Sequence, residues 1–119
     1  MYRILQIEDL PSDAYLIRRE VKKVLDPCEF QIVEDKESFL NALIEFKPDF
    51  IISDFSIPGF DLHSALSLAV EYLPQIPFIV VTGSTSEEIR QNCLKEGAKE
   101  FISKNNIQEL GPVILKMLK

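Results

Sequence analysis

The sequence predicts an α/β protein built on a doubly wound parallel sheet, and two observations lead to this prediction. Short apolar runs begin near residues 3, 30, 50, 78 and 100, and each is followed by an amphipathic pattern of helical period. Alternation of strands and helices at this spacing favours parallel strands joined by right-handed crossovers. With five strands and five helices, we expect the flavodoxin-like strand order 2-1-3-4-5, with helices on both faces of the sheet.

The first two strands are expected over residues 2–7 and 30–33. Pro11 is tolerated in the first turn of a helix and opens the helix between these strands, which Asp26-Pro27 ends. Asp35 follows the second strand and is placed to cap the next helix.

The third strand, residues 50–53, is apolar enough to be buried on both faces. It runs directly into Asp54, and Pro58 and Gly59 then form a turn. Asp61 is a plausible N-cap for the helix that follows.

The fourth and fifth strands are expected over residues 78–81 and 101–103. Between them, residues 84–86 offer capping hydroxyls to a helix that Gly97 ends. Pro112 is expected in the first turn of the last helix. The helix residues expected to face the core are Ala14, Ile17, Val21, Val24, Leu25, Phe39, Leu40, Leu43, Ile44, Ala65, Leu66, Ala69, Tyr72, Leu73, Ile89, Cys93, Leu94, Leu110, Ile114, Leu115 and Leu118.

The chain is predicted to be one domain over residues 1–119, because 46% hydrophobic and 27% charged residues fit a globular protein of this length. A net charge of −6 without a cluster of Lys and Arg argues against direct nucleic-acid binding. No apolar stretch approaches the ~20 residues that span a bilayer, and the N-terminus lacks a signal-peptide pattern. We therefore expect a cytoplasmic protein, with Cys28 and Cys93 as reduced thiols.

Reactive side chains follow four of the predicted strands. Glu8 and Asp9 follow the first strand, Asp54 the third, Thr82 the fourth and Lys104 the fifth. Because the carboxyl ends of parallel strands meet at one edge of the sheet, these residues are expected in a single cleft.

Such a cleft needs a cation. Carboxylates about 5 Å apart repel by roughly 3 kcal/mol per pair at an effective dielectric constant near 20. Oxygen ligands with room for water and a phosphoryl group suit Mg²⁺. We expect Asp9 and Asp54 as direct ligands, the backbone carbonyl of Ser56 as a further ligand, and Glu8 acting through water.

Asp54 is the expected nucleophile. A carboxylate beside Mg²⁺ and the Lys104 ammonium, with the Thr82 hydroxyl and the Gly83 backbone nearby, is equipped to attack phosphorus. The negative charge that develops on the phosphoryl oxygens then has a partner on each side.

These stretches closely resemble the receiver domain of two-component response regulators, and the resemblance covers essentially the whole chain. The matching stretches are Glu8-Asp9, Asp54 with Ile57-Pro58-Gly59-Phe60-Asp61, Thr82-Gly83, and Phe101-Ile102-Ser103-Lys104.

The resemblance implies that Asp54 accepts a phosphoryl group from a histidine kinase or a histidine phosphotransfer protein. It implies that Glu8 and Asp9 serve Mg²⁺ and that Thr82 and Lys104 bind the phosphoryl oxygens. It further implies that Thr82 and Phe101 form a switch that reshapes the face of helix 4, strand 5 and helix 5. Such a domain catalyses only its own phosphorylation and dephosphorylation, and any output domain or effector lies outside this chain.

Two positions depart from the family pattern. Leu62 stands where the family usually has Gly, and Asn105 stands where a Pro in a cis peptide commonly follows the Lys. A cis bond before Asn costs about 3 kcal/mol, so either that strain is tolerated or the loop takes another path.

Two other functions are weighed against the signalling phosphoacceptor. A receiver-like interaction module that works without phosphorylation would not need the full set of acids with Thr82 and Lys104. A phosphohydrolase with an aspartyl intermediate generally has a second acid two residues after the nucleophile, where this chain has Ser56.

Overall fold

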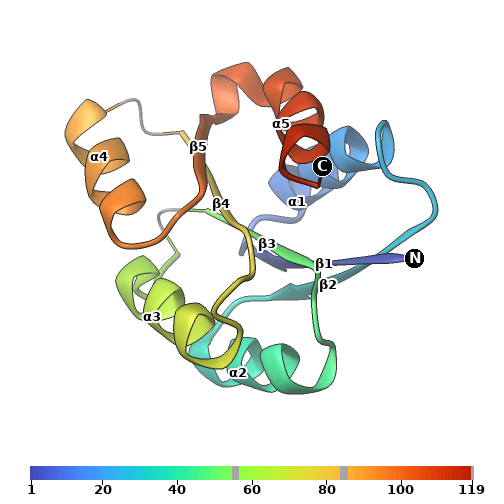
Figure 1. The fold of residues 1–119 in the computed structure, drawn as a ribbon. Helices are drawn as coiled ribbons and strands as arrows, with labels where there is room; N and C mark the ends of the chain where they lie inside the picture. The colour runs from blue at the N-terminus through green and yellow to red at the C-terminus, as the bar shows by residue number, and fades with distance from the viewer. Residues whose placement is uncertain (55–56, 84–85, 119) are drawn as a thin grey trace.

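Five parallel strands form one sheet between two layers of helices (Figure 1). The computed structural model describes residues 1–54, 57–83 and 86–118. The strand order is β2-β1-β3-β4-β5, as predicted. In chain order the elements are β1 (Tyr2–Ile7), α1 (Pro11–Lys22), β2 (Cys28–Val33), α2 (Lys36–Glu45), β3 (Phe50–Ser53), α3 (Leu62–Tyr72), β4 (Phe78–Thr82), α4 (Glu87–Lys95), β5 (Glu100–Ser103), the 3-10 helix η1 (Lys104–Glu109) and α5 (Leu110–Met117).

The sheet divides the hydrophobic core into two halves. Side chains of a strand alternate between the two faces, so Ile51 of β3 packs on the side of α2, α3 and α4, whereas Phe50 and Ile52 pack on the side of α1 and α5. All four residues of β3 are buried. The central strands are therefore apolar on both faces, as parallel strands covered by helices must be.

Backbone hydrogen bonds between β1 and its two neighbouring strands align the ends of these strands. The Asp54 backbone N–H donates a hydrogen bond to the Ile7 carbonyl at 3.0 Å, and the Glu8 N–H donates to the Val33 carbonyl at 3.1 Å. Backbone pairing thus holds the residues after β1 and β3 at the same edge of the sheet.

Helix caps agree in part with the prediction. The Asp35 carboxylate accepts a hydrogen bond from the Ser38 N–H at 2.8 Å, and the Ser86 hydroxyl accepts one from the Ile89 N–H at 3.3 Å. Asp61 is the N-cap of α3, but its side chain makes no capping hydrogen bond to the helix backbone.

Two glycines have the positive φ values that their positions require. The Phe60 N–H donates to the Ile57 carbonyl at 3.1 Å and closes the predicted turn, in which Gly59 has a φ of 77°. Gly97, with a φ of 120°, follows the end of α4 as predicted.

Three residues that were predicted to face the core are exposed instead. The exposed fractions are 52% for Ile44, 44% for Tyr72 and 43% for Leu115. Ala42 and Leu62 are buried, although neither was predicted. The helical period shows which side of a helix is apolar, but it does not fix how wide a stripe is buried. The predicted stripes were too wide at these three positions.

The connection from β5 to α5 runs through a trans peptide bond and a 3-10 helix. The peptide bond between Lys104 and Asn105 is trans, and the chain enters η1 directly. The Asn105 N–H donates to the Ser103 hydroxyl at 3.1 Å, which supports the start of this turn. Pro112 lies in the first turn of α5, as predicted.

Helix α4 is attached to the body of the protein by few buried side chains. All nine of its residues are described, and among them Cys93 alone is buried. A contact between His63 Nδ1 and Glu96 Oε1, 3.1 Å apart, links the start of α3 to the end of α4. A groove of about 630 Å³ lies beside this pair, lined by residues of α4, of α3 and of the turn before α3.

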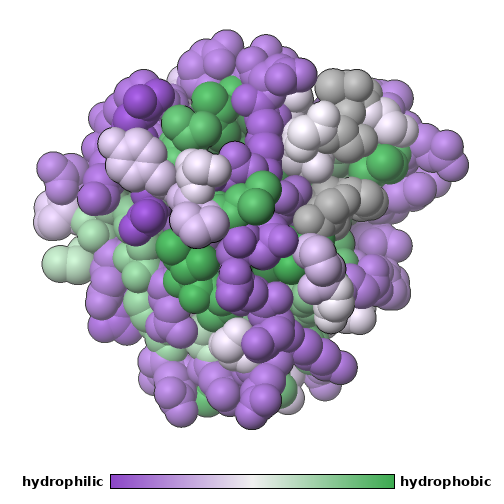
Figure 2. All heavy atoms as spheres, turned by 180° about the vertical axis from the view of Figure 1, so that it is seen from behind, coloured by the Kyte–Doolittle hydropathy of each residue, from purple (hydrophilic) through white to green (hydrophobic). Residues whose placement is uncertain are grey.

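Hydrophilic side chains cover most of the face opposite to the view of Figure 1, and apolar side chains lie among them in small groups (Figure 2). Among the described residues, no helix has both the length and the apolar character needed to cross a membrane.

Two variants of α2 test which of its residues face the core. Leu43→Ala is expected to lower the free energy of unfolding by about 2–5 kcal/mol, because it opens a cavity at a buried position. Ile44→Ala is expected to change it by less than about 0.5 kcal/mol, because the Ile44 side chain is half exposed. Urea unfolding measures both, and equal losses would contradict the observed orientation of α2.

Candidate functional site

The ends of four strands carry polar side chains to the carboxyl edge of the sheet. Glu8 follows β1, Asp54 follows β3, Thr82 is the last residue of β4, and Lys104 follows β5. Glu8, Asp54 and Thr82 are all buried, with exposed fractions of 2%, 8% and 3%. Two carboxyl groups and one hydroxyl are thus buried at one edge of the sheet. They require partners, because an unpaired buried polar group is unfavourable.

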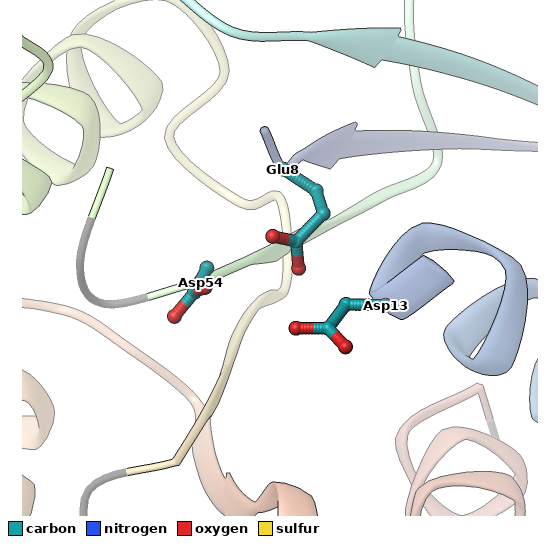
Figure 3. Close-up of side chains that lie close together, drawn as sticks. All are labelled: Glu8, Asp13 and Asp54. Carbon is teal, nitrogen blue, oxygen red and sulfur yellow. The ribbon is translucent and has the colours of Figure 1, made fainter. Parts of the chain in front are cut away.

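The Lys104 ammonium contacts three carboxylates. Its Nζ lies 2.6 Å from Asp13 Oδ2, 3.0 Å from Asp54 Oδ2 and 3.4 Å from Glu8 Oε1. Figure 3 shows the three carboxylates turned toward one space from the end of β1, the start of α1 and the end of β3. The structure thus brings together residues that lie up to 96 positions apart in the sequence.

The acidic cluster contains Asp13, where the sequence had suggested Asp9. One carboxylate oxygen from each of Glu8, Asp13 and Asp54 lies within 4.8 Å of the others. Asp9 is half-buried and is not a member of this cluster. Pro11 starts α1 early enough to place Asp13 in the first turn, facing the sheet edge. An acid in a first helical turn has an ordinary explanation in the helix dipole, so the sequence alone did not single it out.

Burial governs the protonation of Glu8. Removal from water raises the pKa of Glu8 to about 7; the Lys104 ammonium opposes this rise, and the negative charge of Asp54 adds to it. The Leu10 N–H also donates to Glu8 Oε2 at 3.4 Å, which favours the ionised form. Glu8 therefore changes charge near neutral pH in the absence of a divalent ion.

Lys104 remains charged. Burial disfavours its ammonium, but hydrogen bonds to Asp13 and Asp54 and the charge of Glu8 outweigh burial and raise the pKa of Lys104 above its usual value. A fixed positive charge beside Asp54 is what an incoming anionic group requires.

Two further predicted residues, Thr82 and Phe101, belong to the neighbouring strands β4 and β5. Thr82 pairs with Ser103 across β4 and β5, one position before Lys104. Phe101 is partly buried and packs against the core on the side of α3 and α4. The predicted carbonyl of Ser56 lies outside the described residues.

The donor set of the cluster fits a hard divalent cation. All three side chains offer carboxylate oxygens, which Mg²⁺ and related ions prefer, and their spacing allows one ion to reach more than one of them. With all three ionised, the carboxylates exceed the single Lys104 charge by two, which a divalent ion would balance.

Comparison with known proteins identifies close similarity to one family. The family model described as the response regulator receiver domain matches residues 4–114. Chemotaxis protein CheY of Listeria monocytogenes is 27% identical over 96 residues, which cover 78% of this chain and 81% of CheY.

A longer relative and a solved structure agree with this match. The phosphate regulon transcriptional regulatory protein PhoB of Escherichia coli is 36% identical over 106 residues, which cover 86% of this chain but 44% of PhoB. The crystal structure of a response regulator from Hahella chejuensis superimposes with a TM-score of 0.81 at 25% identity, covering 98% of this chain and 92% of that one.

The raised pKa of Glu8 predicts a pH dependence of stability. Folded Glu8 binds its proton more tightly than unfolded Glu8, whose ordinary pKa is 4.5, so its contribution is complete below pH 4.5 and is lost as pH rises toward 7. In a chelating buffer, Glu8→Gln should therefore gain stability relative to wild type between pH 5 and pH 7.5, on the order of 2 kcal/mol. Urea unfolding at several pH values measures this difference, and a constant difference would contradict the burial of an ionisable Glu8.

Proposed function

This chain belongs to the family of response regulator receiver domains, and we propose that it is a phosphoacceptor in which Asp54 receives the phosphoryl group. The donor is a phosphohistidine on a histidine kinase or a histidine phosphotransfer protein. The observation that carries the proposal is the 3.0 Å contact between Lys104 Nζ and Asp54 Oδ2, inside a cluster of further carboxylates. A lysine held against a buried aspartate at a sheet edge is the arrangement that phosphoryl transfer to that aspartate needs.

The proposed transfer forms one bond and breaks one bond at phosphorus. A carboxylate oxygen of Asp54 bonds to phosphorus while the bond from phosphorus to the imidazole nitrogen of the donor breaks. The electron pair of that bond stays with the imidazole nitrogen, which takes up a proton from solvent, so that the donor leaves as neutral imidazole. Hydrolysis later replaces the Asp54 oxygen on phosphorus with a water oxygen and releases inorganic phosphate.

Lys104 and Thr82 are the proposed partners of the phosphoryl oxygens. Lys104 supplies a positive charge that is already in position, so little reorganisation is needed as charge develops on the transferred group. Thr82 supplies a hydroxyl at the end of the adjacent strand. A side-chain carbon added at Gly83 would meet no atom within 4 Å, which is consistent with room for an anionic group beside this backbone.

The proposed cofactor is Mg²⁺, held at the acidic cluster. Asp54, Glu8 acting through water, Asp9 and the Ser56 carbonyl are the ligands that the sequence suggests, and the oxygen donors of the described cluster are compatible with such an ion. When bound, the ion would neutralise charge on the phosphoryl group. The chain's own residues orient Asp54 and hold Lys104 beside it.

Thr82 and Phe101 are the proposed switch. Thr82 is buried at the end of β4, and Phe101 lies partly exposed in the neighbouring strand β5. A shift of the Thr82 side chain toward a phosphoryl group is proposed to change the space available to the Phe101 ring. The face of α4, β5 and α5 would then carry the signal. Because the matched region covers 44% of PhoB, an output domain or separate effector is proposed to act outside this chain.

Phosphorylation of the intact protein tests the proposal. Incubation with Mg²⁺ and acetyl phosphate is expected to add the mass of one phosphoryl group, and intact mass spectrometry measures it. Asp54→Asn is expected to gain none. An unchanged wild-type mass, or the same gain in the variant, would falsify the assignment of Asp54 and favour an interaction module that works without phosphorylation.

Removal of the Lys104 charge tests the position of the metal. Lys104→Met deletes a positive charge that would repel a divalent ion bound at the carboxylates it contacts, so Mg²⁺ affinity should rise at least about tenfold. Asp54→Asn and Glu8→Gln should weaken binding, and Glu45→Gln, on the exposed side of α2, should leave it unchanged. Isothermal titration calorimetry measures these affinities. Equal affinity in wild type and Lys104→Met would mean that the ion binds elsewhere.

A further inference from the structure

Asp13 makes the shortest of the three contacts with Lys104. The 2.6 Å distance from Lys104 Nζ to Asp13 Oδ2 compares with 3.0 Å to Asp54 and 3.4 Å to Glu8. A short contact between an ammonium and a carboxylate is a strong, charge-assisted hydrogen bond. It joins the start of α1 to the residue after β5, across 91 positions of the chain.

The three hydrogen atoms of the Lys104 ammonium are matched by three carboxylates. An ammonium has three N–H donors and no acceptor, and the structure gives Lys104 one partner in each of Glu8, Asp13 and Asp54. A phosphoryl oxygen on Asp54 therefore has to share or displace one of these partners. The Asp13 contact is the one least easily given up, because it is the shortest.

The negative charge of Asp13 also disfavours a phosphoryl group on Asp54. Addition of a phosphoryl group to an ionised carboxylate increases the negative charge at Asp54 by about one unit near neutral pH. An oxygen of Asp13 lies within 4.8 Å of an oxygen of Asp54, so its charge repels this addition. Asp13 thus disfavours the phosphoryl group in two ways, because it engages the Lys104 ammonium and because its charge repels the added negative charge.

We propose that Asp13 is a positioning residue that holds the Lys104 ammonium toward α1 and thereby lowers the affinity of Asp54 for a phosphoryl-like group. The inference rests on the proposed function, because it assumes that Asp54 is the acceptor. It goes beyond that function by assigning to α1 a residue that sets how readily the modified state forms.

The test is the affinity for beryllofluoride, an anionic mimic of a carboxylate-bound phosphoryl group, at saturating Mg²⁺. Asp13→Asn keeps the size of the side chain and removes its charge, and we expect it to bind beryllofluoride about tenfold more tightly than wild type. Asp13→Glu restores the charge and should bind as weakly as wild type. Glu45→Gln changes the net charge equally at an exposed position of α2 and should match wild type.

The readout is a titration followed by NMR of the backbone amides of Thr82 and Lys104, with ¹⁵N-labelled lysine reporting the Lys104 ammonium directly. In Asp13→Asn the signal of the Lys104 ammonium should already be shifted before beryllofluoride is added, because its contact with the Asp13 carboxylate is lost. A variant that only disturbed the structure of α1 would not have to show this shift. Equal or weaker binding of beryllofluoride by Asp13→Asn at saturating Mg²⁺ would overturn the inference.

Failure of the proposed function has a different signature. If wild type binds neither beryllofluoride nor a phosphoryl group, then Asp54 is not the acceptor and both proposals fall. If wild type binds and Asp13→Asn gains nothing, the proposed function stands and the role of Asp13 alone is wrong.

Discussion

The site depends on one ammonium that is shared by three carboxylates. Glu8 and Asp54 are buried, and like charges at this spacing would oppose folding unless a cation stood between them. Lys104 supplies that cation from the far end of the chain, and its contacts connect β1, α1 and β3 to β5. Removing one member of such a group leaves the others unbalanced, so the cluster acts as a unit rather than as separate pairs.

The parallel sheet makes this convergence possible. Each crossover returns the chain to the same starting edge, so every strand ends at the opposite edge, where Asp54, Thr82 and Lys104 follow one another across three neighbouring strands. The two halves of the core, one on each face, hold the strands in place over their full length. Apolar packing therefore holds the sheet and its helices together, and the polar residues of the site lie at the carboxyl edge of the sheet.

The strand order and most of the residues around Lys104 could be predicted from the sequence, because both follow from short patterns of neighbouring residues. Apolar runs ending on Glu8, Asp54 and Lys104 could be recognised one by one, and the strand order then brought them together. Asp13 could not be predicted in this way, since its contact with Lys104 depends on the angle at which α1 leaves the sheet. The exposure of Ile44 was missed for a similar reason, because the helical period does not state how wide a face the sheet will cover.

Helix α4 differs from the other α-helices in how few side chains it buries. Cys93 is its one buried residue, and the His63–Glu96 pair that links it to α3 is largely exposed to solvent. Displacing this helix would consequently forfeit less hydrophobic free energy than displacing a helix with several buried side chains, such as α3. Among the α-helices, α4 is thus the one that can shift at the least cost in buried apolar surface, and it follows β4, whose last residue, Thr82, lies at the carboxyl edge of the sheet.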